Sequence, residues 1–423
     1  MKTKLLLASM LALGVHQTVL SQVDVNGYTS VNLTTGANYQ NRVFFDLSAN
    51  SIVSQPADSW DLAFYRNSNM SFGTRINDAQ NVEVYQASNV ASNWDNIDIA
   101  NIASWGNPLY NPDQTTSLQE GAFEQGTATY GWGEYNPGNH HIEGKVIFVL
   151  KYLNTNTYYK FMITDYYGGY TFKYSKWNGS SWEPTQTKTI ANGSDDAYFN
   201  YFSFTTGEKV ANLEPPKANW DLMFTRYWTY YNNTMMYRMS GVIQNPNITV
   251  AKVQPESQET STFSLPSSTS FSGNITAIGH SWKPTSGVHS DVVYYIKQGS
   301  EYYRMYFTQN GGASTGNMYF KYKNITSTLG ITEVNKKASF GIYPNPTTAD
   351  KKVTILFDIK EKANQKGNVE IYDLSGKKVY VAELTNQTGL YKQELHLSHL
   401  TSGNYIVKIT YGGSTETKKL IVK

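Results

Sequence analysis

The chain has 423 residues, which at about 150 residues per domain predicts two or three domains. Hydrophobic residues make up 40% and charged residues only 16%, with 33 Tyr, 18 Phe and 9 Trp, so packed cores are expected and general disorder is excluded. The formal net charge is +2 and like charges form no long block, which excludes an electrostatic surface for nucleic acid. Abundant Tyr, Thr, Asn, Ser and Gly favour strands and turns, so we expect an all-β protein.

The N-terminus has the pattern of an export signal. Lys2 and Lys4 precede the apolar run from Leu5 to Val15, which is too short for a membrane-spanning stop-transfer helix. We predict a signal peptide over residues 1–22, and no transmembrane span once it is removed; the alternative is a buried N-terminal helix. The chain has no cysteine, which excludes disulfides, thiolate metal sites and cysteine nucleophiles.

Residues 339–423 have the pattern of a small separate domain, preceded by a linker at residues 330–338. Short strand-like runs alternate with turns that contain glycine, which predicts an immunoglobulin-like β-sandwich. The runs are Val353 to Phe357, Val369 to Tyr372, Lys378 to Leu384, Lys392 to Leu397, Asn404 to Tyr411 and Lys418 to Val422.

Four motifs in this domain occur in order. They are Tyr343-Pro-Asn-Pro346, Val369-Glu-Ile-Tyr-Asp-Leu-Ser-Gly376, Leu400-Thr-Ser-Gly-Asn-Tyr405 and the basic end Lys418 to Lys423. With them the domain resembles the type A C-terminal sorting domain of the type IX secretion system. The resemblance implies that the type IX machinery is a partner, and that the protein is secreted or anchored at the outer-membrane surface. An ordinary immunoglobulin-like binding domain is the alternative.

The region between these ends repeats itself. Trp60-Asp-Leu-Ala-Phe-Tyr-Arg66 recurs as Trp220-Asp-Leu-Met-Phe-Thr-Arg226, 220 − 60 = 160 residues later. Further matches are Phe44 to Leu47 with Tyr201 to Phe204, Val146 to Val149 with Val293 to Ile296, Tyr158 to Lys160 with Tyr302 to Arg304, and Thr171 to Tyr174 with Tyr319 to Tyr322. Two copies with so long a period predict tandem domains rather than a solenoid. We place domain 1 at residues 23–190 and domain 2 at residues 191–329.

Each copy has the pattern of an antiparallel meander. Apolar residues alternate in Trp60, Leu62 and Phe64, so we expect these three side chains on one face of a strand. Asp61 and its counterpart Asp221 then point the other way, and for both we expect a structural hydrogen bond or ion pair.

At these repeated segments the copies resemble the HmuY family of exported haem-binding proteins, and the second copy resembles it more closely. The resemblance implies two tandem antiparallel HmuY-like β-domains. It also implies haem as a cofactor, with the iron coordinated by two axial side chains, His or Met, on loops at one end of the sheet.

The candidate haem ligands lie in domain 2. His280 comes 293 − 280 = 13 residues before the strand at Val293, about where the family carries one histidine ligand. A neutral imidazole is a suitable axial donor, and Trp282 is a candidate for packing on the porphyrin. The second ligand stays open, because the segment from Met235 to Thr262 contains no histidine; Met235, Met236 and Met239 are the candidates there.

Domain 1 offers weaker candidates. The counterpart of His280 is Gly133, and the nearest donors are His140 and His141. Neighbouring residues of a strand point to opposite faces, and no third ligand with suitable spacing is recognisable, so we expect no metal site. The chain also lacks the nucleophile elbow, phosphate-binding loop and dinucleotide-binding patterns, so we expect no enzyme activity.

We therefore expect an exported binding protein that captures haem through domain 2. The alternative is a surface adhesin or glycan-binding protein without haem, in which exposed aromatic rings stack on sugars. Its candidate rings are Trp94, Trp105, Tyr110, Trp132, Trp177, Trp182, Trp228 and Tyr230. Loss of His280 or the methionines should abolish haem binding but not glycan binding.

Overall fold

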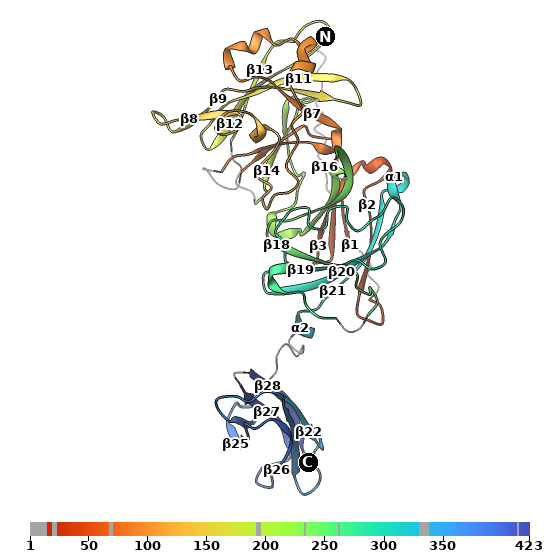
Figure 1. Cartoon of the computed structure of the whole chain (residues 1–423), viewed down its shortest axis with the longest axis vertical. Helices are drawn as coiled ribbons and strands as arrows, with labels where there is room; N and C mark the ends of the chain where they lie inside the picture. The colour runs from red at the N-terminus through yellow and green to blue at the C-terminus, as the bar shows by residue number, and fades with distance from the viewer. Residues whose placement is uncertain are drawn as a thin grey trace, which may run out of the picture. The chain divides into compact units, whose positions relative to one another are not determined.

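The computed structural model describes residues 15–18, 23–66, 71–191, 196–231, 234–260, 263–329, 338–412 and 414–423. Over these residues the chain forms several antiparallel sheets with a few short helices, so the all-β prediction is confirmed (Figure 1). The chain divides into two compact units, Met1–Gly330 and Ile331–Lys423. Of the predicted signal peptide, only the backbone of Val15–Thr18 is described, and of the predicted linker, only Ala338.

The first unit contains two lobes, each with its own sheets. Lobe 1 comprises residues 57–215. Its strands are β5 (Leu62–Tyr65), β6 (Thr74–Ile76), β7 (Val82–Ser88), β8 (Gly133–Asn136), β9 (His141–Gly144), β10 (Ile147–Tyr152), β11 (Thr157–Tyr166), β12 (Gly169–Lys176), β13 (Gln186–Ala191), β14 (Phe199–Ser203) and β15 (Glu208–Val210). Short 3-10 helices are η2 (Asp78–Gln80), η3 (Ala91–Asn96), η4 (Ile99–Ser104) and η5 (Phe123–Gln125). One sheet has the order β13-β12-β11-β10-β7, with β9 and β8 beside β11, and the other has the order β15-β14-β5-β6.

Lobe 2 comprises residues 23–56 and 216–329, with β1 at its edge. Its strands are β1 (Val15–Thr18), β2 (Thr29–Thr34), β3 (Asn41–Asp46), β4 (Ser51–Pro56), β16 (Leu222–Tyr231), β17 (Met235–Gln244), β18 (Ile248–Val253), β19 (Val293–Gln298), β20 (Glu301–Asn310) and β21 (Asn317–Asn324). Its short helices are η1 (Ala37–Tyr39), η6 (Lys217–Asn219), η7 (Ser268–Ser270), α1 (Gly312–Thr315) and α2 (Thr326–Leu329). The sheet orders are β1-β4-β3-β16-β17 and β18-β19-β20-β21-β2.

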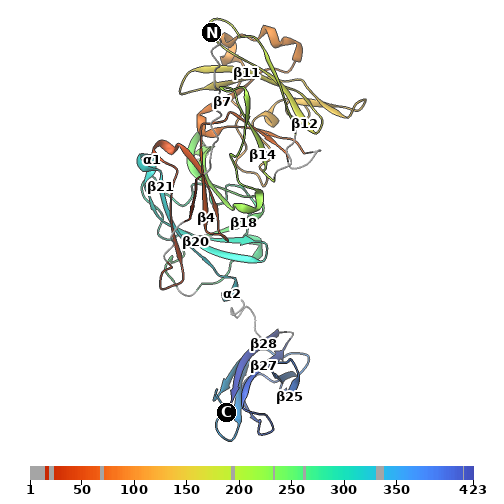
Figure 2. The same cartoon turned by 180° about the vertical axis from the view of Figure 1, so that it is seen from behind.

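Two hairpins are exchanged between the sequence repeats. The β3–β4 hairpin belongs to the first copy, yet β3 pairs with β16 of the second, with Phe45 opposite Leu222. Reciprocally, β14 of the second copy pairs with β5 of the first, with Phe202 opposite Leu62. The red-brown N-terminal strands accordingly lie among the green and cyan strands of lobe 2 (Figures 1 and 2). Strand pairing therefore crosses the boundary predicted between residues 190 and 191.

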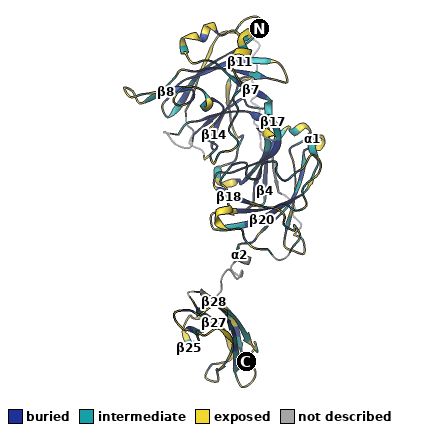
Figure 3. Cartoon of the chain, in the orientation of Figure 1, coloured by how far each residue is buried: buried dark blue, intermediate teal, exposed yellow. Residues whose placement is uncertain are grey.

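Each lobe buries one main core along its strands (Figure 3). A third buried cluster joins the lobes and includes Phe44, Trp60, Tyr201 and Trp220. Trp60 packs in this junction cluster with Ala63, whereas Leu62 and Phe64 belong to the core of lobe 1. The expectation that Trp60 shares a face with Leu62 and Phe64 is thus wrong, because β5 begins at Leu62 and the period-two alternation does not extend back to Trp60.

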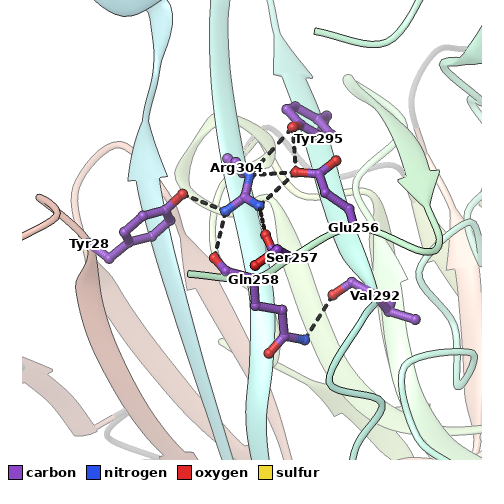
Figure 4. Close-up of polar contacts among 7 residues, drawn as sticks. All are labelled: Tyr28, Glu256, Ser257, Gln258, Val292, Tyr295 and Arg304. Carbon is purple, nitrogen blue, oxygen red and sulfur yellow. Dashed lines mark hydrogen bonds and ion pairs between the residues drawn. The ribbon is translucent and has the colours of Figure 1, made fainter. Parts of the chain in front are cut away.

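A buried guanidinium ties separate segments of lobe 2 together. Arg304 on β20 is fully buried and forms an ion pair with Glu256, with Nη2 2.6 Å from Oε1. Its nitrogens also donate to the hydroxyl of Tyr28 at 2.5 Å and to the backbone carbonyls of Ser257 and Gln258 at 2.7 and 2.9 Å (Figure 4). Because a buried charge is tolerated only when it is paired and hydrogen-bonded, this arrangement fixes the loop after β18 to the sheet.

The second unit is a two-sheet sandwich. Its strands are β22 (Ala338–Tyr343), β23 (Lys352–Ile359), β24 (Gly367–Tyr372), β25 (Lys378–Leu384), β26 (Gly389–His396), β27 (Gly403–Tyr411) and β28 (Ser414–Val422), in the sheets β22-β23-β26 and β25-β24-β27-β28. Alternating residues such as Ile355 and Phe357 on one sheet and Ile371 and Val407 on the other form a single core. The strands predicted for this domain are all present.

Candidate functional site

His280 lies in the loop that connects β18 to β19, where this loop runs along β17. Gly279 and Val242 exchange two backbone hydrogen bonds, of 2.9 and 3.2 Å. Gly279 has a φ of +51°, and a Cβ there would lie 2.8 Å from the Tyr227 hydroxyl, so the close approach favours glycine. The turn places Nδ1 of His280 2.9 Å from the hydroxyl oxygen of Tyr227 on β16.

A groove of about 480 Å³ lies beside His280 and Tyr227. Its wall is rich in hydroxyl and amide groups and contains one ammonium group. These polar side chains are Gln114, Thr229, Lys252, Ser270, Ser272, Asn274, Thr276 and Ser281. The aliphatic residues in the lining are Val250, Ala277 and Ile278. The groove therefore combines many hydrogen-bond donors and acceptors with an apolar surface of similar extent.

The β16–β17 hairpin continues from the groove as a two-stranded ribbon. Residues two apart on a strand share a face, so Tyr231 lies on the same face as Tyr227 and Thr229. Residues directly opposite in an antiparallel pair also share a face, which adds Tyr237, opposite Thr229. The rings of Tyr231 and Tyr237 have centroids 6.0 Å apart, and the two side chains are 41% and 53% exposed. An exposed pair of tyrosines therefore extends the face that carries the groove.

The three candidate methionines are divided between the two faces of this ribbon. Met239 lies opposite Tyr227, and Met235 lies opposite Tyr231, so both share the face of the groove. Met236 lies opposite Tyr230 and shares the other face. Met239 is half-buried and Met235 is 56% exposed. The structure thus brings Met239 to the same face as the histidine's partner Tyr227.

Trp282 lies in the core of lobe 2. Its indole stacks on Phe307 with a centroid distance of 4.0 Å and an interplanar angle of 15°, and its Nε1 donates to the carbonyl of Gly279 at 3.1 Å. Only 1% of its surface is exposed. The ring is therefore covered by protein, and its hydrogen bond to Gly279 stabilises the turn that carries His280.

The charges near the groove affect how readily the histidine takes up a proton. Burial lowers the pKa of His280 below its usual value, and the positive charge of Lys283 lowers it further. Burial also lowers the pKa of Lys283 to about 8. Its Nζ donates to the Ser240 hydroxyl at 2.5 Å. The imidazole is therefore neutral near pH 7, as both a metal ligand and a hydrogen-bonding side chain require.

His140 and His141 lie on the β8–β9 hairpin of lobe 1 and have separate partners. His140, with a φ of +63°, has Nδ1 2.5 Å from the Tyr135 hydroxyl. His141 has Nδ1 2.7 Å from Oδ1 of Asp165, and its ring stacks on Tyr167. The structure does not bring the two imidazoles into one site. No group of three or more potential ligands for a metal occurs among the described residues.

The aromatic residues expected to bind glycans are mostly packed. Trp94, Trp132 and Trp228 are buried, whereas Tyr230 is 61% exposed. The others, Trp105, Tyr110, Trp177 and Trp182, are half-buried. The exposed rings on the face of the groove are instead Tyr231 and Tyr237 of the β16–β17 ribbon. Tyr227, Thr229 and Tyr231 follow a period of two along β16, and this pattern could have placed Tyr231 on the face of the groove.

The comparisons with known proteins assign the C-terminal domain. Residues 341–423 match the family of secretion system C-terminal sorting domains, which confirms the predicted type IX sorting domain. The chain is therefore a secreted or cell-surface protein. No curated protein matches the chain, and the resemblance of the two copies to the HmuY family stays a prediction. Among the residues that the structure describes, no helix is long and apolar enough to cross a membrane.

Proposed function

We propose that this exported protein is a glycan-binding protein, and that it holds a saccharide in the groove beside His280. One observation carries the proposal. A groove walled by hydroxyl and amide groups continues into an exposed tyrosine pair on the same face of the β16–β17 ribbon. Saccharides present many hydroxyl groups together with flat apolar faces, so polar walls and neighbouring rings match both parts. This function is binding rather than catalysis.

The test is a glycan array probed with the full chain, followed by affinity measurements on the best ligand. Replacing Tyr237 by Ala removes one ring of the exposed pair, and we expect the affinity to fall by about tenfold, which corresponds to about 1.4 kcal/mol. Tyr167→Ala is the matched control, because Tyr167 is 64% exposed but lies in lobe 1. Equal affinities of both variants and the parent chain would refute the groove as the site.

Haem is the second candidate, and a specific observation favours it. Nδ1 of His280 is engaged by Tyr227, whereas Nε2 has no hydrogen-bond partner among the described residues. A ligating histidine commonly has its second nitrogen held in this way, and Met239 shares the face of Tyr227. We rank haem second because polar residues make up much of the lining and Trp282 is buried in the core, whereas a porphyrin gains most of its binding from buried apolar area.

A visible-light titration with hemin distinguishes the two candidates. Haem binding predicts a sharpened Soret band that saturates at one equivalent, is lost in His280→Ala and changes in Met239→Ala. Glycan binding predicts no saturable spectral change and an array signal that withstands Met239→Ala. The titration also decides whether His280 ligates metal or only lines the groove.

A further inference from the structure

A small cavity lies where the two lobes meet and shares no lining residue with the His280 groove. Its volume is about 60 Å³, and its lining includes residues from both lobes. Trp60 of the first copy and Trp220 of the second occupy equivalent positions in the repeat, and both line it. The cavity therefore lies at the place where the two copies of the repeat face each other.

Four buried N–H donors on the cavity's lining residues lack a protein acceptor. They are Nε of Arg42, Nε of Arg226 and Nε1 of both tryptophans, none of which has a hydrogen-bond partner in the described part of the chain. Arg42 is only 4% exposed, Trp60 7% and Trp220 2%. A buried donor without an acceptor costs about 1–3 kcal/mol, so four around one cavity indicate an acceptor that is not part of the protein.

Two other buried cations of the same fold have protein partners. The guanidinium of Arg304 reaches a carboxylate, two backbone carbonyls and two tyrosine hydroxyls (Figure 4). Lys160, its counterpart in the first copy, donates to the carbonyl of Trp94 at 2.9 Å. By contrast, Arg42 uses Nη2 on the carbonyl of Leu213 at 2.7 Å, and its Nε has no acceptor. The side chain of Arg226 forms no hydrogen bond or ion pair with any described residue, and its guanidinium lies over the Tyr39 ring at 5.3 Å.

The charge around the cavity is positive on balance. Arg42, Arg75 and Arg226 line it, against the carboxyls of Asp78 and Glu214. Both carboxyls already have donors within the protein, since Asp78 accepts from Asn111 at 2.8 Å, and Glu214 accepts from the Tyr201 hydroxyl and the Tyr198 backbone. Burial raises the pKa of Asp78 to about 7 and raises that of Glu214, which weakens their negative charge.

We propose that the junction cavity binds a compact oxyanion of the phosphate or sulfate class. The guanidiniums of Arg42 and Arg226 supply charge, and the two indole N–H groups supply neutral donors. Guanidinium groups match the geometry of such oxyanions, and hydrogen bonds between charged groups are the stronger ones. A cavity needs about 10–15 Å³ to hold one water molecule. The cavity volume of 60 Å³ is therefore enough for about four to six water-sized groups, which suits a compact ion.

The test uses the full chain in a buffer free of oxyanions. Phosphate and sulfate are titrated separately by calorimetry at constant ionic strength, with the thermal midpoint followed in parallel. We expect saturable binding at one equivalent and a raised thermal midpoint for at least one of the two ions. The ion with the higher affinity shows whether the cavity prefers phosphate or sulfate. Absence of binding by either ion would overturn the proposal.

Variants locate the ion. Arg226→Met removes a half-buried guanidinium, and Trp60→Phe keeps a ring while removing its N–H; we expect each to weaken binding by about tenfold. Lys209→Met is the control, because this exposed lysine does not line the cavity and should bind the ion as the parent chain does. Crystals grown with selenate should show anomalous density in the cavity. Density for water alone, or equal binding by all variants, would show that the cavity is not an oxyanion site.

Discussion

The carboxylate of Asp221 accepts a hydrogen bond from the backbone N–H of Leu47, with 2.8 Å between Oδ2 and the nitrogen. Asp61 makes the equivalent contact in lobe 1, where its Oδ2 lies 2.6 Å from the backbone nitrogen of Phe204. Leu47 directly follows β3 and Phe204 directly follows β14, so each aspartate holds a hairpin that comes from the other copy of the repeat. The structural hydrogen bond expected for both aspartates is present, and it stabilises the exchange of hairpins.

Replacing Asp221 by Ala should destabilise the protein by about 1–3 kcal/mol. The substitution leaves the buried N–H of Leu47 without an acceptor, and it also removes the acceptor of the Gln298 amide, now 2.7 Å away. Urea unfolding of the full chain measures the loss. Asp58→Ala is the control, since Asp58 is exposed, and its effect should stay within about 0.5 kcal/mol. Equal unfolding midpoints for the two variants would contradict a role for Asp221 in holding the hairpin.

The same aspartate should make stability depend on pH. Burial raises the pKa of Asp221 to about 7, so between about pH 4 and 7 the folded protein binds a proton that the unfolded chain has released. Stability from this group is therefore highest at low pH and falls as the pH rises through that interval. Above about pH 7 the carboxyl is ionised in both states, and the contribution is constant.

Asp221→Asn isolates this effect. The amide oxygen can still accept from Leu47, and its NH₂ can donate to Oε1 of Gln298, a buried oxygen without a partner among the described residues. We measure the urea midpoint of the variant minus that of the parent chain at each pH. We expect this difference to be larger at pH 8 than at pH 5. A difference that does not change with pH would show that Asp221 is ionised throughout this range in the folded protein.

The sequence predicts the hairpins but not their exchange, and the reason is physical. Turn residues and the alternation of apolar and polar residues are local features of the sequence. They predict that Val146 to Tyr152 and Tyr158 to Thr164 pair as neighbouring strands, which are β10 and β11 in the structure. The partner of β3 is not a local property. Phe44 to Leu47 and Tyr201 to Phe204 carry similar apolar patterns, so either could complete either sheet, and only the tertiary structure decides between them.

For the same reason, only part of the candidate site could be predicted from the sequence. His280 was identified by its spacing from the strand at Val293, but its partner Tyr227 is 53 residues away in the chain. Trp282 was expected to face a ligand, because the sequence does not reveal that Phe307 on β20 lies under its ring. The junction cavity could not be predicted from the sequence either, because it forms only where Trp60 and Trp220 approach each other between the two lobes.

Breaking the buried ion pair of lobe 2 should be costly. Arg304→Met leaves the Glu256 carboxylate without its cationic partner, although the Tyr295 hydroxyl still donates to it, and we expect a loss of about 3–5 kcal/mol in urea unfolding. Arg304→Lys should also destabilise, because one ammonium group cannot reproduce the separate contacts of a guanidinium. The double variant Arg304→Met with Glu256→Gln should recover part of the loss, because it leaves no unpaired charge. A double variant as unstable as Arg304→Met would exclude the unpaired carboxylate as the cause.

The pKa of His280 should respond to Lys283. The lysine's positive charge lowers this pKa in addition to the effect of burial, so Lys283→Met should raise it. Titration of the imidazole by NMR measures the shift directly. Lys209→Met removes a charge from β15 in lobe 1 and should leave the titration of His280 unchanged. If both variants titrate like the parent chain, the neighbouring ammonium does not influence the imidazole.

Removing Phe340–Lys423 should separate folding from sorting. All sheets of the first unit are formed by strands between Val15 and Asn324, so the truncated chain should still show the far-ultraviolet circular dichroism of a β-protein and a cooperative thermal transition. It lacks the sorting domain, however, and should therefore accumulate in the periplasm instead of reaching the surface or the medium. Cell fractionation with an immunoblot measures its location, and a resident periplasmic protein controls for leakage. The full-length Asp58→Ala variant should be delivered like the parent chain. Truncated protein found outside the cell without leakage would show that delivery does not depend on the C-terminal domain.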